Sequence, residues 1–127
     1  MEKLTQTNYV DLAEQVISEK IERTKRGDIK LTTSKIRNLL SLVNNLYNET
    51  SSSNSDELDD DIKAQIQYVR LRFVYEAGRE KDVKDFVEKA NILNHIKKIE
   101  TRDDLILFCR YMEALVAYHR FCGGKDK

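Results

Sequence analysis

Apolar residues recur at intervals of three and four along most of the chain, the spacing that places them on one face of a helix. Asn8 is placed to cap a first predicted helix, with Asp11 at its third position, and Gly27 is placed to stop it. After a connection over 27–33, Thr33 is placed to cap a second helix. The apolar stripes of these two helices are Leu12, Val16 and Ile21, and then Ile36, Leu39, Leu40, Val43, Leu46 and Tyr47.

Three further helices follow a polar stretch at 50–55, whose composition indicates a linker. Acidic residues open the third helix, where the helix dipole favours them, and Gly78 ends or breaks it. A fourth helix has a short continuation through 92–99, and Thr101 with Asp104 forms a capping box for a fifth helix that runs to about Phe121. The predicted core positions are Leu58, Ile62, Ile66, Val69, Phe73 and Ala77; Val83, Phe86, Val87 and Ala90; and Leu105, Phe108, Met112, Leu115 and His119.

Composition supports the same architecture. The 127 residues include no proline and only four glycines, which suits long helices and argues against a turn-rich β protein. The sequence therefore predicts an all-α protein, a compact bundle of about five helices in a single domain over 1–127, with a polar and acidic linker near 50–61. We find no run of about 18 apolar residues and no secretory leader, so we expect a cytoplasmic protein.

Residues suited to catalysis or metal binding are sparse. His95 and His119 belong to different predicted helices, and we expect His119 in the core and His95 at the surface. Cys109 and Cys122 lie roughly 20 Å apart if one helix carries both, too far for a disulfide, so we expect two reduced core thiols. No phosphate-binding loop, nucleophile motif or metal-ligand spacing is present, and we therefore predict no enzyme activity, no metal and no cofactor.

Charge is distributed unevenly although it sums to zero. Residues 49–61 hold six acids and no base, so the remainder of the chain carries 22 − 16 = +6. On the third helix, Tyr68, Arg72, Tyr75 and Arg79 follow at i, i+4, i+7 and i+11, on one face away from the core, with Arg70 apart at the core margin. Guanidinium groups bind phosphate and aromatic rings stack on bases, but the same face also suits a protein interface. Periodicity leaves both interpretations open.

The second helix offers another polar face. Arg37, Ser41, Asn44 and Asn48 share it, with Lys30 and Lys35 near its entry, and the set suits phosphate and sugar contacts as well as plain solvation. The stretch LTTSKIRNLLSL is similar in pattern to a DNA-recognition helix. However, the connection of about seven residues before it is longer than the tight turn of a helix-turn-helix, which argues against a DNA-reading regulator.

Five stretches, taken in order, carry a resemblance that spans almost the whole chain: NYVDLAEQVI, LTTSKIRNLLSL, QYVRLRFVYEAGRE, VKDFVEKANIL and FCRYMEALVAYHRFCGGKD. Together they resemble the small subunit of the type III-A CRISPR–Cas effector, the Csm complex of antiviral defence. The resemblance implies a non-catalytic helical subunit that self-associates into a filament along the guide RNA and target RNA. It also implies contact with the repeating backbone subunit and with the polymerase-like large subunit.

The resemblance further implies that basic residues on an inner face bind RNA. At the matching positions these are Lys35, Arg37, Arg70, Arg72, Arg79, Arg110 and Arg120. The last two share a face with Glu113, and the alternative is that they pair with it or with another subunit. The competing function is a helical scaffold or adaptor that makes only protein–protein contacts.

Overall fold

The computed structural model describes residues 3–51 and 56–126, and the described part is helical, with no strand. Its elements are α1 (Tyr9–Gln15), the π-helical turn η1 (Val16–Lys20), α2 (Thr33–Ser51), α3 (Asp60–Arg79), α4 (Lys81–Lys89), α5 (Ile92–Lys97) and α6 (Arg102–Phe121). The all-α bundle predicted from the sequence is confirmed, with α4 and α5 in place of the fourth helix and its continuation.

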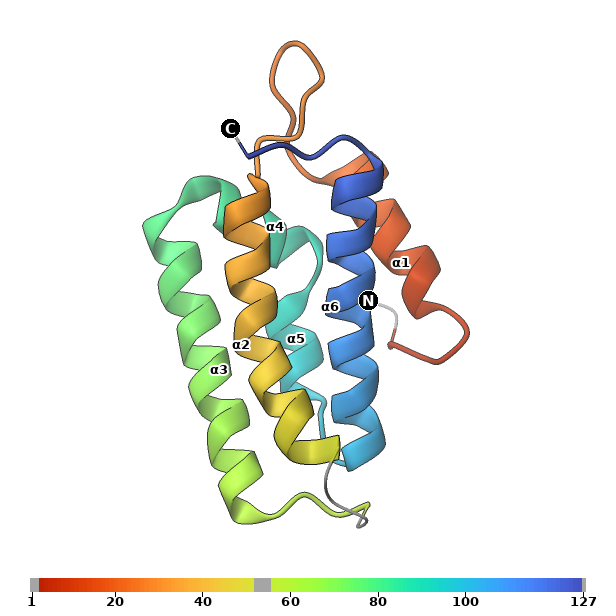
Figure 1. Ribbon diagram of the computed structural model, residues 1–127, viewed down its shortest axis with the longest axis vertical. Helices are drawn as coiled ribbons and strands as arrows, with labels where there is room; N and C mark the ends of the chain where they lie inside the picture. The colour runs from red at the N-terminus through yellow and green to blue at the C-terminus, as the bar shows by residue number, and fades with distance from the viewer. Residues whose placement is uncertain (1–2, 52–55, 127) are drawn as a thin grey trace.

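Three long helices form the body of the bundle (Figure 1). Helix α2 packs between α3 and α6, the shorter α4 and α5 pack against α3, and α1 lies on the far side of α6 from α2. Helix α6 therefore has neighbours on opposite sides, as its broad apolar circumference predicts. The Tyr111 hydroxyl donates to the Ala90 carbonyl at 2.9 Å and ties α6 to the α4–α5 segment as well.

The start of α3 and both ends of α6 follow the local signals in the sequence, whereas α3 continues through Gly78, its predicted stop, and ends at Arg79. Asp59 caps α3 by accepting a hydrogen bond from the Ile62 amide at 2.9 Å. The Thr101 hydroxyl accepts from the Asp104 amide while the Asp104 carboxylate accepts from the Thr101 amide, both at 3.1 Å, which is the predicted capping box. Gly123 adopts φ 93°, a left-handed conformation that ends α6 at low steric cost. All five predicted core residues of α6 are buried.

The first predicted helix is wrong at its C-terminal end. It stops near Lys20 instead of Gly27, and Ile21 is extended. Two contacts favour this exit: the Arg23 guanidinium donates to the Ile17 carbonyl at 2.9 Å, and the Glu22 amide donates to an Asp85 carboxylate oxygen at 2.8 Å. The chain thus leaves the helix at Ile21 and contacts α4 at Glu22, because tertiary contacts outweigh the helical spacing.

Two boundaries of α2 also differ from the prediction. Thr32, not Thr33, supplies the capping oxygen, which accepts from the Lys35 amide at 3.3 Å; the buried Thr33 hydroxyl has no partner. At the other end the helix continues to Ser51, so the first two residues of the predicted 50–55 linker are helical. The rest of that linker, 52–55, lies outside the described residues.

The surface position predicted for His95 is wrong. Asn91 adopts a left-handed φ of 54°, which separates α4 from α5 and resets the phase of the following turn. His95 then lies on the inner face of α5, with its ring edge-on to Tyr111 at a centroid distance of 5.2 Å. Burial lowers the pKa of His95 to about 4, so the ring is neutral at physiological pH.

Candidate nucleic-acid interface

The outward face of α3 carries the aromatic and cationic residues that the sequence placed there. Tyr68 and Tyr75 are 60% and 54% exposed, while Ile66, Val69 and Phe73 of the same helix are buried in the core. Helical spacing separates the two sets because the core residues occupy only one side of the helix. Tyrosine rings left this open to solvent are available to a ligand or to a neighbouring subunit.

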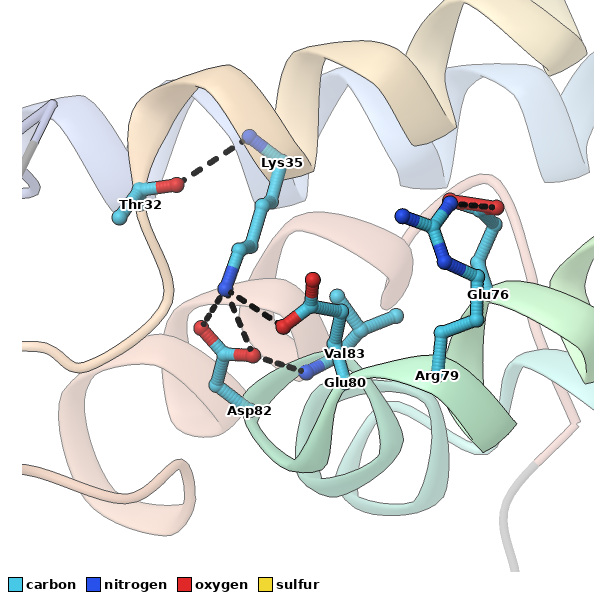
Figure 2. Close-up of polar contacts among 7 residues, drawn as sticks. All are labelled: Thr32, Lys35, Glu76, Arg79, Glu80, Asp82 and Val83. Atoms are coloured by element: carbon cyan, nitrogen blue, oxygen red, sulfur yellow. Dashed lines mark hydrogen bonds and ion pairs between the residues drawn. The ribbon is translucent and has the colours of Figure 1, made fainter.

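Arg72 and Arg79 are held together by Tyr75 and Glu76, two of the six residues between them. The Arg72 and Arg79 guanidinium groups lie 3.5 and 3.2 Å from the same Glu76 carboxylate oxygen, the second of which Figure 2 shows. Their Cζ atoms lie 5.2 and 5.7 Å from the centroid of the Tyr75 ring, within the range of cation–π attraction. One carboxylate faces two guanidiniums, so the cluster keeps a net charge of +1.

Lys35 sits in a different environment from these arginines. Its ammonium group lies 2.9 Å from an Asp82 oxygen and 3.1 Å from a Glu80 oxygen, and all three side chains converge in Figure 2. The hydrogen bond to Asp82 chiefly raises the pKa of Lys35. Two carboxylates outnumber the single cation, so this cluster has a net charge of −1 and joins α2 to the start of α4. Lys35 is thus engaged in a structural contact.

A groove of about 450 Å³ lies between α2 and α3, beside the arginine cluster. Its apolar lining comes from Leu42, Leu46 and Val69, and its polar lining from Asn45, Asn48 and Gln65, with Tyr68 at the side of α3. The sequence alone did not identify Asn45 and Gln65, because a groove between two helices combines residues that periodicity assigns to separate faces. No charged residue lines this groove in the described part of the chain.

The remaining predicted cations lie on other helices or on another side of α3. Arg37 and its neighbour Ser41 are exposed on α2, and Arg110 and Arg120 are exposed on α6. Arg70 lines a separate cleft of about 390 Å³ on the α5 side of α3, together with Lys63 and Lys97, two cations that were not predicted from the sequence. Lys63 stands seven residues before Arg70, a spacing of two helical turns that would have identified it.

Groups suited to catalysis are buried or scattered. Cys109 and His119 are buried, and burial raises the pKa of the Cys109 thiol to about 12. His119 is in the core, as predicted, where its ring Nε2 lies 2.7 Å from the Leu31 carbonyl oxygen. Within residues 3–51 and 56–126 no three His, Cys, Asp or Glu side chains are arranged to hold a metal ion, and no helix there is long and apolar enough to cross a membrane.

Comparison with known proteins agrees with the resemblance found in the sequence. The family model for Csm2 of type III-A matches residues 6–125. A "CRISPR system Cms protein Csm2" of Streptococcus thermophilus is 53% identical over 123 residues, covering 97% of this chain and 98% of that protein. A protein of the same name from Mycobacterium tuberculosis strain CDC 1551 is 43% identical over 123 residues, covering 96% and 97% of the two chains. The chain therefore belongs to the Csm2 family, the small subunits of type III-A CRISPR systems.

Proposed function

We propose that this protein is a non-catalytic, cytoplasmic subunit that stacks in several copies along the guide RNA and target RNA and binds the RNA backbone. The site for the backbone is the exposed face of α3, with Arg72 and Arg79 as the phosphate-binding residues. The repeating backbone subunit and the polymerase-like large subunit are its protein partners.

The arginine cluster is the observation that carries this proposal. A guanidinium binds a phosphate bidentately, and here two of them are positioned by one tyrosine ring and one carboxylate. The side chains of Arg72 and Arg79 are 36% and 53% exposed, so each keeps open surface for a ligand in addition to its contact with Glu76. Pairing with a guide supplies sequence information, so a protein that contacts only the backbone is sufficient for positioning.

Exposed apolar residues support the assembly part of the proposal. Leu71 and Val74 of α3 are exposed beside the tyrosines, and Phe121 at the end of α6 is 83% exposed. Apolar side chains gathered at a surface favour contact with another protein, including a second copy of the chain. The alternative function, a scaffold with protein contacts alone, rests on these same residues.

The test is the double variant Arg72→Ala/Arg79→Ala in the assembled complex. We expect full assembly, weaker RNA binding and a smaller salt dependence. The slope should fall by about 0.7 for each phosphate of a single strand that the variant no longer neutralises, multiplied by the number of copies. Lys25→Ala/Arg26→Ala is the matched control, because it removes the same charge from exposed positions in the connection before α2.

Stoichiometry and salt slope are measured on the same preparation. An unchanged slope in a fully assembled double variant removes these residues from the RNA site. Failed assembly, with a full slope in the complex that remains, supports the protein-only scaffold instead. Metal-dependent RNA cleavage that survives repurification of the chain would contradict the non-catalytic proposal.

A further inference from the structure

The groove between α2 and α3 has the chemistry of a site for a flat, uncharged group. Its lining combines aliphatic side chains with side-chain amides, and the exposed Tyr68 ring stands at its side. Phosphate sites in proteins are rich in cations or backbone amides, and among the described residues that line this groove there is no cation. The volume of about 450 Å³ falls within the range of small-ligand sites.

The position of the groove links it to the arginine cluster. Tyr68 precedes Arg72 by one helical turn, about 6 Å along α3 at 1.5 Å per residue, and Arg79 follows two turns later. A single strand whose phosphates follow the two arginines therefore runs along α3 toward Tyr68. Its next base is then close enough to reach the groove while its backbone stays at the exposed surface.

We infer that this groove binds an unpaired nucleobase of a single RNA strand, which stacks on the Tyr68 ring and forms hydrogen bonds with the side chains of Asn45 and Gln65. This inference rests on the proposed function, since the strand whose base enters the groove is the strand whose phosphates lie at Arg72 and Arg79. A side-chain amide offers both a donor and an acceptor, so it matches the edge of any base. The groove thus accepts bases with little regard to sequence, as stacking sites for single strands do.

A protein side chain fits this groove less well than a base does. The exposed aliphatic residues of α3, which suit an apolar protein neighbour, lie elsewhere: at 100° per residue, Leu71 is about 120° and Val74 about 180° around the helix from Gln65. The groove itself combines an aromatic ring with amides, a set suited to stacking and to in-plane hydrogen bonds.

The experiment compares two ligands with equal backbone charge: a fluorescent ten-residue oligouridine and the same ribose-phosphate chain with abasic positions. Both are titrated with the full-length chain at hundred-micromolar concentrations, because non-specific binding commonly has a Kd of about 10⁻⁴–10⁻⁶ M. We expect the oligouridine to bind at least about fivefold more tightly, the lower end of the effect of stacking one base.

Variants then separate base binding from phosphate binding. Tyr68→Ala/Gln65→Leu should abolish the preference for oligouridine and leave the salt slope unchanged, whereas Tyr68→Phe should retain the preference. Arg72→Ala/Arg79→Ala should lower the salt slope with both ligands and spare the preference.

Each contrary result has a defined meaning. Equal affinity for the two ligands with a normal salt slope overturns the base site alone. A Tyr68→Ala/Gln65→Leu variant that keeps the preference but loses neighbouring subunits from the purified complex makes the groove a protein interface and also overturns it. No salt-dependent binding of either ligand overturns the base site together with the proposed function.

Discussion

Replacing Glu76 by glutamine should strengthen RNA binding. Glu76 is the carboxylate that faces both Arg72 and Arg79, and its side chain is largely covered. Glu76→Gln keeps the shape of the side chain and an oxygen that accepts hydrogen bonds, but it raises the net charge of the cluster from +1 to +2. A phosphate bound to these arginines no longer meets a fixed negative charge behind them.

The size of the effect follows from Coulomb's law. A phosphate on the open side of a guanidinium would lie about 6 Å from the Glu76 carboxylate, a repulsion of about 0.7 kcal/mol at the dielectric constant of water. Its removal corresponds to about threefold tighter binding per site. The free energy of unfolding should fall by less than about 1 kcal/mol, since each ion pair that the variant removes is exposed at one end and such pairs contribute about 0.3–0.5 kcal/mol within a helix.

Affinity is measured by fluorescence anisotropy with a labelled oligouridine at two salt concentrations, and helicity by circular dichroism. Glu80→Gln is the matched control, because it also removes one carboxylate from an ion pair, but this carboxylate pairs with Lys35 and not with the arginines. We expect the gain from Glu76→Gln to shrink as salt rises and Glu80→Gln to give a smaller gain. Equal or weaker RNA binding by a fully helical Glu76→Gln variant would refute a phosphate site at these arginines.

Three further predictions concern stability. Phe73 is fully buried, so Phe73→Ala should cost about 3–5 kcal/mol, and an unchanged denaturation midpoint would place the ring at a surface instead. Gly124→Ala should destabilise the chain because the added Cβ would fall on the ring of His119. Gly78→Ala lies in open space within α3 and should instead raise stability by about 0.5–1 kcal/mol. Equal thermal midpoints for the two variants would contradict the predicted difference. Because the pKa of His95 is lowered in the folded chain, the unfolded chain binds a proton at this residue first as pH falls. The stability that the neutral His95 ring contributes is therefore complete above about pH 6.5 and is lost as pH falls toward about 4. The free energy of unfolding falls by up to roughly 1.4 kcal/mol per pH unit in this range. Denaturation of His95→Gln between pH 6.5 and 5 should lack this slope, and an identical slope in the variant would assign it to other groups.

The sequence by itself determined the features that depend on neighbours along the chain. Apolar spacing identified the core faces of α2, α3 and α6, and the hydrogen bonds at Asp59 and Thr101 form within one turn of the helices that they cap. The tyrosine–arginine face of α3 was equally predictable, because residues at i, i+4, i+7 and i+11 share a face whatever the helix packs against. These features could be read without knowing the fold.

Only the tertiary structure decided which charged residues pair between different helices. Lys35 and its partners Glu80 and Asp82 are 45 and 47 residues apart, so no helical spacing reveals that this cation is already neutralised. The same holds for the early exit of the chain at Ile21, which a contact with Asp85 on α4 favours, and for the groove that brings Asn45 of α2 next to Gln65 of α3. Local spacing determines the face of a helix on which a residue lies, but the packing of helices determines what that face meets.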